Sequence, residues 1–350
     1  MNHDGITFHN VSELEPLPNG PFKLQRFPAT VRNVLGITGH QRGRFYAHRL
    51  PGVELRFVTE SPFISLSLMA IEADTQVVVY YGDFAHARYH LKAGAVTTLF
   101  LERPTSFLAV EPGSLKVGRF SSDVWRVLFH QDARAAYIGR EVYGSIIRPP
   151  RPDEVPARRW LAYGSSITCG ADAFHPATSY AQQAARRMGV DVINLGLPGS
   201  CLAEPVMADY LAGRDDCDLI TCELGVNMTM WFTPEEFEQR IRHLLAIITD
   251  RRPQRPVVAL NIFPNQWSDR SCTRVDTDAL RTIAYNGIVP KVVEELARPN
   301  LHFIDGRSVF PDFNGLTTDL IHPSDEGHIR MGENLAALLN PYFKYPEQSS

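Results

Sequence analysis

The sequence predicts two consecutive domains: an all-β, jelly-roll-like β-sandwich over residues 1–150 and an α/β/α sandwich with a parallel sheet over residues 151–350. Residues 50–145 contain short apolar segments, many alternating with period two, which is typical of strands in an antiparallel sandwich. From residue 160 onward, short apolar strands alternate with helical segments, which predicts a parallel sheet covered by helices on both faces. The proline-rich stretch 148–152 favours extended backbone and marks the predicted boundary.

Five segments of the N-terminal half have the composition of β-strands. They are residues 53–58, 64–68, 77–81, 96–101 and 124–129. Turn-forming residues separate several of them, at positions 82–83, 92–94 and 112–113. No amphipathic helical pattern interrupts this region, so we expect the segments to pair with one another in sheets.

The C-terminal half contains five predicted strands with helices between them. The strands are residues 160–163, 192–195, 219–224, 257–262 and 301–304, and three of the helices are residues 180–188, 278–296 and 326–339. A fourth helix begins after Thr233, because Thr233 and Glu236 have the capping-box spacing and Pro234 occupies the first helical position. Its apolar residues between positions 237 and 248 recur with the helical period. We expect Gly189 to end the first helix.

The composition is that of a globular protein without a strong charge field. Hydrophobic residues make up 44% and charged residues 21% of the 350 residues, and the net charge is −4. Such a chain does not attract phosphate backbones, so we expect no nucleic-acid partner. Residues 1–20 contain no apolar core of a signal peptide, and no segment approaches the roughly 18 apolar residues of a spanning helix. We therefore expect a cytoplasmic protein without a membrane partner; the oligomeric state is not indicated.

The cysteines and histidines do not form the patterns of a disulfide framework or a metal site. The five cysteines are Cys169, Cys201, Cys217, Cys222 and Cys272. None belongs to a CxxC pair and their number is odd, so we interpret them as buried or unreactive thiols. The histidines, among them His175 and His328, have no metal-ligand spacing, and we expect no metal and no other cofactor.

Polar and glycine-containing loops follow the predicted strands at their carboxyl ends. GSSIT (164–168) follows the first strand, GLPGS (196–200) the second and GVNM (225–228) the third. DLIHP (319–323) lies beyond the fifth strand. Because ligands of open parallel sheets bind outside the carboxyl ends of the strands, we expect these loops to line one site.

The residue types in these loops suit acyl transfer. Ser166 would be the nucleophile and His322 the base that activates it. Asp319 would orient the imidazole and stabilise its charged form. The backbone N–H groups of Ser166 and Gly199 and the side-chain amide of Asn227 would bind the oxyanion of the tetrahedral intermediate.

These four blocks, taken in order, resemble those of the SGNH (GDSL-like) hydrolases over roughly residues 158–340. In that family the serine before Ile-Thr is the nucleophile, the second and third blocks supply oxyanion donors, and the last block supplies an aspartate and the base. The resemblance assigns these roles to Ser166, Gly199, Asn227, Asp319 and His322. It also implies a flavodoxin-like α/β/α fold for the catalytic domain.

Two positions depart from the family pattern. Ser165 stands where an acidic residue is usual, and Met228 stands where an aspartate usually follows the asparagine, which removes a polar support for Asn227. Ordinary roles also stay open. Ser166 could be a turn or helix-capping serine, or Ser165 could be the nucleophile instead. His322 could be a structural loop residue, and Asp319 could cap the following segment. Gly199 and Asn227 could be simple turn residues.

The chain most resembles the family branch in which a β-sandwich precedes the hydrolase domain. That branch contains deacetylases acting on sugars and an acyltransferase that decorates a polyketide. We therefore expect a serine-dependent enzyme that removes a short acyl group, such as acetyl, from a carbohydrate or another small alcohol. Two alternatives stay open: transfer of the acyl group from Ser166 to a natural-product alcohol, and a glycan-binding protein with a degenerate hydrolase scaffold.

Several side chains are candidates for binding the substrate. Trp231 and Trp267 follow the third and fourth predicted strands and could line a pocket or belong to the core. Glu223 lies within an apolar strand, where a structural carboxylate is the ordinary interpretation and an acid at the rim of the site is the alternative. On the sandwich, side chains such as Trp125, Arg119 and Arg126 could hold an acceptor, although packing in the core explains Trp125 equally well.

Overall fold

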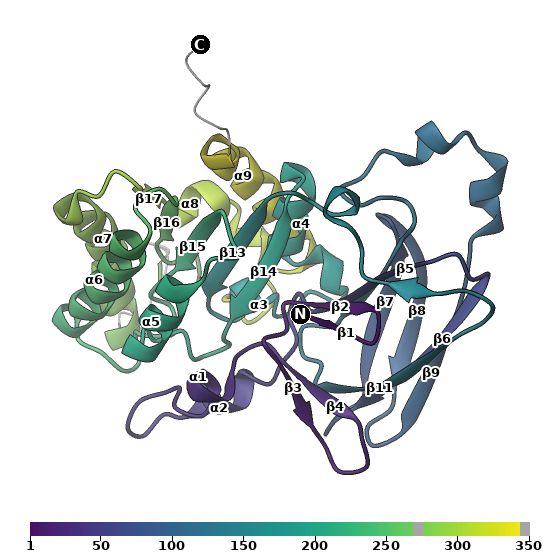
Figure 1. The fold of residues 1–350 in the computed structure, drawn as a ribbon. Helices are drawn as coiled ribbons and strands as arrows, with labels where there is room; N and C mark the ends of the chain where they lie inside the picture. Colours follow the sequence, from purple (N-terminus) through teal and green to yellow (C-terminus); the bar gives the residue numbers. More distant parts are fainter. Residues whose placement is uncertain (269–275, 344–350) are drawn as a thin grey trace. The chain divides into compact units, whose positions relative to one another are not determined.

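The computed structural model describes residues 1–268 and 276–343 and divides the chain into two compact units (Figure 1). The first unit comprises residues 1–29 and 47–157, and the second comprises residues 30–46 and the chain from residue 158 onward. This division differs in two ways from the predicted boundary at residue 150. The linker up to residue 157 belongs to the first unit, and the segment 30–46 belongs to the second.

Two antiparallel sheets form the first unit, which confirms the predicted β-sandwich. The strands of one sheet, in spatial order, are β1 (Asn2–His3), β2 (Ile6–His9), β5 (Glu54–Thr59), β10 (Val124–Phe129), β7 (Thr75–Tyr81) and β8 (Phe84–Leu91), with β12 (Ile147–Arg148) also paired to β5. The other sheet contains β3 (Glu13–Pro16), β4 (Phe22–Gln25), β11 (Ala135–Val142), β6 (Phe63–Ala70) and β9 (Val96–Glu102). Side chains from both sheets, including Phe57 and Leu66, share one buried core.

Trp125 and Arg126 lie inside the sandwich and are not surface residues that could hold an acceptor. Trp125 is 1% exposed and Arg126 is 3% exposed. The Arg126 guanidinium bonds to Glu54 Oε1 at 2.6 Å and to Asp83 Oδ1 at 2.7 Å. Burial alone raises the pKa of Glu54, but the charges of Arg126 and Arg56 outweigh it and hold that pKa well below its usual range. The buried arginine is therefore a structural ion-pair partner.

The second unit contains one five-stranded parallel sheet, as predicted. The strand order is β14 (Asp191–Gly196), β13 (Arg159–Gly164), β15 (Leu219–Glu223), β16 (Val257–Leu260) and β17 (Leu301–Ile304). Numbered along the chain, this order is 2-1-3-4-5, which is that of flavodoxin-like folds. The predicted flavodoxin-like α/β/α architecture is confirmed.

Helices cover the parallel sheet in two groups (Figure 1). Helices α4 (Tyr180–Met188) and α9 (Asp325–Phe343) pack against each other, and their apolar side chains share a core with Trp160 and Val258 of the sheet. Helices α5 (Pro205–Gly213), α6 (Pro234–Arg251) and α7 (Thr277–Leu296) form the second group, packed in series. The short helices of this unit are α2 (Arg42–Tyr46), α3 (Ser166–Cys169) and α8 (Gly306–Val309), and all but the first residue of α1 (Ala29–Arg32) belongs to it as well. Short 3-10 helices occur in both units. In the first unit they are η1 (Thr105–Ala109), η2 (Pro112–Leu115) and η3 (Pro152–Glu154), and in the second unit they are η4 (Pro176–Thr178) and η5 (Phe313–Gly315).

Local signals in the sequence explain where two of these helices begin and end. The Thr233 hydroxyl accepts a bond from the Glu236 N–H, and the Glu236 carboxylate accepts one from the Thr233 N–H, which confirms the capping box at the start of α6. Gly189 ends α4 with a left-handed φ of 69°, as predicted. Helix α5 was not predicted, because the apolar residues of its sequence do not recur with a clear helical period.

Within residues 1–268 and 276–343, no helix has the length and apolar character needed to cross a bilayer. The four cysteines that the structure describes, Cys169, Cys201, Cys217 and Cys222, form no disulfide among the described residues. Cys272 lies outside the described residues. Burial raises the pKa of Cys222 to about 12, which matches the prediction of an unreactive thiol.

Candidate active site

The predicted loops of the second unit meet at the carboxyl edge of the parallel sheet. Ser166 is the first residue of α3, directly after β13, and Gly199 follows β14. Asn227 follows β15, and His322 lies in the loop that precedes α9. Parallel strands end at the same edge, so residues that are far apart in the sequence come together there.

Ser166 and His322 form a direct hydrogen bond. Ser166 Oγ lies 2.7 Å from His322 Nε2, and the serine is 8% exposed. Its neighbour Ser165 faces another way, because the Ser165 hydroxyl accepts a bond from the Ile167 N–H at 3.1 Å and caps α3. Of the two serines, Ser166 is therefore the one positioned to react.

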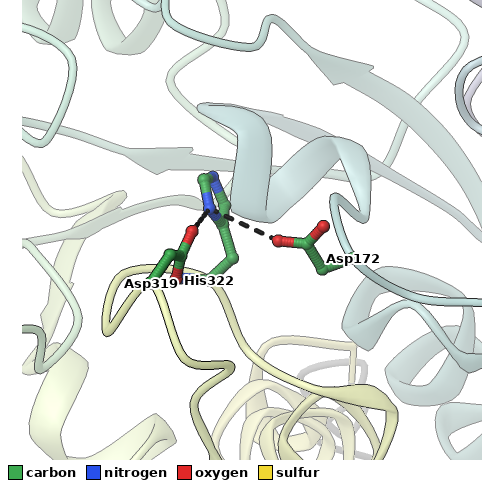
Figure 2. A group of neighbouring side chains, drawn as sticks. All are labelled: Asp172, Asp319 and His322. Atoms are coloured by element: carbon green, nitrogen blue, oxygen red, sulfur yellow. Dashed lines mark hydrogen bonds and ion pairs between the residues drawn. The ribbon is translucent and has the colours of Figure 1, made fainter.

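The second ring nitrogen of His322 is held by Asp319 (Figure 2). His322 Nδ1 lies 2.6 Å from Asp319 Oδ2, while Asp319 Oδ1 accepts bonds from the backbone N–H groups of Ile321 and His322 and from the Thr317 hydroxyl. Partial burial raises the pKa of Asp319, but these hydrogen bonds outweigh it and lower the pKa to about 2. The carboxylate is thus ionised at neutral pH and can only accept, so Nδ1 carries a proton and Nε2 is free to accept the Ser166 proton.

A residue that the sequence analysis missed, Asp172, lies on the other side of the imidazole (Figure 2). Asp172 Oδ2 is 3.5 Å from His322 Nδ1, and the side chain is 50% exposed. The residue follows α3, so the same loop carries the candidate nucleophile and a second carboxylate near the candidate base. Nothing in the local sequence marks this aspartate, because its position depends on a left-handed φ of 65°.

The three side chains in Figure 2 also have the donor atoms of a metal site. One donor atom from each of Asp172, Asp319 and His322 lies within 4.8 Å of the others. The Nδ1 atom already forms its 2.6 Å bond to Asp319, and a cation bound at that nitrogen would have to displace the bond. We therefore interpret the group as an imidazole flanked by two carboxylates.

Gly199 and Asn227 face the same edge, and each has a fixed orientation. Gly199 adopts a left-handed φ of 59°, which a residue with a side chain would adopt only at a cost of about 1 kcal/mol or more. Asn227 Oδ1 accepts a bond from the Cys201 N–H at 3.1 Å. Since an N–H can only donate, the amide oxygen of Asn227 faces Cys201 and the amide NH₂ points away from it. Cys201 thus supplies the polar support that Met228 does not.

Replacing Asn227 with alanine is expected to lower kcat by about 100- to 1,000-fold and to change KM little. An oxyanion donor binds the transition state more strongly than the substrate, so its loss affects the chemical step. Steady-state kinetics with an activated ester measures both constants. A change in KM alone would identify Asn227 as a substrate-binding residue instead.

The three candidate substrate-binding residues differ in their surroundings. Glu223 is buried, and its Oε2 accepts bonds from the Ser165 N–H at 2.6 Å and from the Thr168 hydroxyl at 3.1 Å. Burial raises the pKa of Glu223, although these hydrogen bonds oppose the shift. This placement favours the structural interpretation of Glu223. Trp231 is 37% exposed. Trp267 is half-buried, and the side chain of its neighbour Gln266 donates to the Asp319 carbonyl oxygen. Both tryptophans remain candidates for lining a pocket.

A buried histidine braces the loop behind the nucleophile. His328 of α9 donates from Nε2 to the Ala171 carbonyl at 2.9 Å, and its Nδ1 accepts from the Tyr180 N–H at 3.3 Å. Burial lowers the pKa of His328 to about 4, although the bond to Ala171 opposes this. The neutral imidazole is therefore the form that the folded protein holds.

Acidification is expected to destabilise the protein through His328. The unfolded histidine titrates near pH 6.5, so between about pH 6.5 and 4 the unfolded chain binds a proton that the folded chain does not. The free energy of unfolding should fall across this window by up to about 3 kcal/mol from this residue. Urea unfolding at several pH values measures it, with His328→Gln for comparison. The variant should be less stable at pH 7 and should lose less stability on acidification. If the free energy of unfolding fell equally with pH in both proteins, His328 would not be the group responsible.

Comparison with known proteins relates both units to solved structures. A salicylyl-acyltransferase from a tetracycline biosynthetic pathway superposes with a TM-score of 0.78 at 19% identity, covering 95% of each chain. A family two carbohydrate esterase from Clostridium thermocellum, solved with cellohexaose, gives a TM-score of 0.61 at 14% identity over 84% of this chain and 93% of its own. An acetyl xylan esterase from Butyrivibrio proteoclasticus gives 0.57 at 13% identity over 98% and 97%. At such identities the likeness concerns the fold.

Sequence comparison is more specific for the second unit. No curated protein sequence matched the chain. Residues 162–330, however, match the model of the GDSL-like lipase/acylhydrolase family, and this range contains all four loops of the candidate site. Over residues 162–330, the chain therefore belongs to the GDSL-like lipase/acylhydrolase (SGNH) family.

Proposed function

We propose that this chain is a serine-dependent carboxylic-ester hydrolase that removes a short acyl group, such as acetyl, from a carbohydrate or another small alcohol. In this proposal Ser166 is the nucleophile, His322 is the general base and acid, and Asp319 orients the imidazole. The N–H groups of Ser166 and Gly199 and the side-chain NH₂ of Asn227 form the oxyanion hole.

One observation carries this proposal: a continuous chain of short hydrogen bonds runs from Ser166 through His322 to Asp319. The two distances are 2.7 Å and 2.6 Å. A serine hydroxyl is a weak nucleophile by itself, and an imidazole at hydrogen-bond distance removes its proton as it attacks. The ionised Asp319 stabilises the imidazolium that forms in this step.

The reaction follows from these contacts in two halves. Ser166 Oγ attacks the ester carbonyl carbon while its proton moves to His322 Nε2, and the carbonyl oxygen becomes an oxyanion. The intermediate then collapses, the bond to the alcohol oxygen breaks, and Nε2 returns the proton to that oxygen. Water repeats the sequence on the acyl-enzyme and gives the free acid and a restored Ser166.

A carbohydrate ester is the favoured substrate because of the fold relatives. The solved structures similar to this chain include a carbohydrate esterase bound to cellohexaose and an acetyl xylan esterase, and both likenesses extend over most of the two units. Trp231 is 37% exposed, and partly exposed aromatic rings are suited to packing against sugar rings.

Acyl transfer to an alcohol other than water is the second candidate function. The similar acyltransferase matches 95% of this chain with a TM-score of 0.78, so both units have counterparts in an enzyme named for transfer. The same acyl-enzyme serves either outcome, because an alcohol held beside Ser166 competes with water through its high effective concentration.

Partitioning of the acyl-enzyme distinguishes the two candidates. Purified protein is supplied with p-nitrophenyl acetate and a series of sugars or polyketide alcohols, and acetylated product and free acetate are quantified. Free acetate as the sole product, together with release of acetate from acetylated xylan, supports the hydrolase. Predominant acetylation of one alcohol, supplied at millimolar concentration, would contradict the hydrolase proposal and support the acyltransferase instead. Absence of turnover on every ester would leave the glycan-binding alternative.

A further inference from the structure

The segment 30–46 joins the second unit from a distant part of the chain and contacts the loop of Gly199. The Gly36 N–H donates to Glu204 Oε1 at 3.0 Å, and His40 Nε2 lies 2.8 Å from the Gly199 carbonyl oxygen. A Cβ added to Gly43 of α2 would lie 3.6 Å from Ser200 Cβ. The segment therefore makes two hydrogen bonds to residues 199–204 and passes close to Ser200, more than 150 positions further along the chain.

His40 is the residue of this segment that reaches both loops of the proposed oxyanion hole. It is 7% exposed. Its Nε2 bonds to the Gly199 carbonyl, and its ring lies 4.4 Å from that of Trp231 at an interplanar angle of 32°. Trp231 follows Asn227 by four residues in the loop after β15. One buried imidazole thus contacts the loops that present Gly199 and Asn227.

The direction of the bond from His40 is fixed by its acceptor. A carbonyl oxygen cannot donate, so His40 Nε2 carries the proton and donates it to Gly199. A tight turn holds the imidazole in place, because Ile37 and His40 exchange two backbone bonds of 2.9 Å. Gly36 permits this turn: its φ is 108°, and a Cβ there would lie 2.5 Å from the His40 carbonyl oxygen.

The bond to Gly199 acts on a turn whose shape determines where the Gly199 N–H points. Residues 197–200 form a turn closed by the Ser200 N–H on the Leu197 carbonyl at 3.1 Å. Proline at the second position and glycine with positive φ at the third are typical of a type II turn. His40 binds the carbonyl of the next peptide, Gly199–Ser200, and thereby fixes the position of the glycine whose N–H is proposed to face the oxyanion.

We infer that His40 is a positioning residue that holds the Gly199 turn so that its N–H stays aimed at the oxyanion. The catalytic unit is then complete only with the segment 30–46, which the chain supplies before most of the sandwich. This inference rests on the proposed esterase function for its kinetic consequence. Its structural consequence, a less stable Gly199 turn without the His40 bond, does not depend on that function.

The test compares His40→Ala, His40→Gln and the control His243→Ala, an exposed histidine on α6. His40→Ala should lower kcat about 10- to 100-fold with little change in KM, because the bond acts on a transition-state contact. Glutamine keeps an N–H donor and should restore part of kcat. Affinity for a trifluoromethyl ketone transition-state analogue should fall in parallel with kcat, while affinity for acetate stays unchanged.

Amide hydrogen exchange of residues 197–203 provides a readout that is independent of activity. In His40→Ala the exchange of the Ser200 and Cys201 amides should accelerate at least about tenfold, less so in His40→Gln and not in the control. Unchanged exchange would overturn the inference even if the protein showed no esterase activity. If the wild type is active, three kinetic results would also overturn the inference and leave the proposed function standing. They are an unchanged kcat in His40→Ala, a change in KM alone, and an equal loss of kcat in both His40 variants.

Discussion

Ester turnover is expected to fall by about 10⁴- to 10⁶-fold when Ser166 is replaced by alanine. No other hydroxyl takes its place, because the adjacent Ser165 is turned away to cap α3 and Ser166 Oγ is the atom bonded to His322 Nε2. Removing a hydroxyl that is 8% exposed leaves the surrounding packing intact, so the variant should unfold at nearly the same temperature as the wild type. Initial rates with p-nitrophenyl acetate and a thermal melt measure both quantities.

Two other serine variants complete this experiment. Ser114→Ala changes an exposed serine of the first unit and should keep full activity. Ser165→Ala removes a helix cap at a cost of about 1 kcal/mol in stability, but it should keep measurable turnover. Retained activity in Ser166→Ala together with its loss in Ser165→Ala would place the nucleophile one residue earlier.

The second large effect is expected at His322. His322→Ala removes the group that moves the proton in both halves of the reaction, so its loss of kcat should approach that of Ser166→Ala. Asp319→Asn should be milder or comparable, with a loss of up to about 10⁴-fold, since the imidazole remains but its tautomer and charge are less well supported. Asp172, 3.5 Å from Nδ1, provides a second negative charge that can stabilise the imidazolium in that variant.

The contribution of the second carboxylate can be measured with a double variant. Asp172→Asn alone should lose little activity, and Asp172→Asn combined with Asp319→Asn should lose more than the two single losses combined. Asp209→Asn, an exposed aspartate on α5, is the matched control. A fully active Asp319→Asn enzyme would mean that another group orients His322.

The sequence was sufficient to predict the parallel sheet and most of the candidate site. Each predicted strand of the second unit is a short apolar run, and such runs are buried on both faces in a parallel sheet. Because the chemistry-bearing loops follow the ends of these strands, topology alone was enough to expect Ser166 and His322 at one edge. Helix α6 could be predicted from a capping box and an apolar stripe, which are local signals.

Features that depend on distant contacts could not be predicted in this way. The segment 30–46 has no strand pattern, and its place in the second unit results from tertiary bonds such as that between His40 and Gly199. Asp172 comes near His322 through a left-handed backbone angle that its sequence does not encode strongly. Asn227, which lacks a polar neighbour because Met228 follows it, is supported by the backbone N–H of Cys201. Every residue except proline has a backbone N–H, so the sequence does not show which one fills this role.

The most direct test of a covalent mechanism at Ser166 is mass-spectrometric detection of the acyl-enzyme. The protein is mixed rapidly with p-nitrophenyl acetate, quenched in acid within the first turnovers, digested and analysed by fragmentation. We expect one acetyl group per chain, located on Ser166 and absent from Ser166→Ala. Acetylation of Ser165 or of another residue in step with turnover, or full turnover without any acetylated serine, would contradict the proposed mechanism.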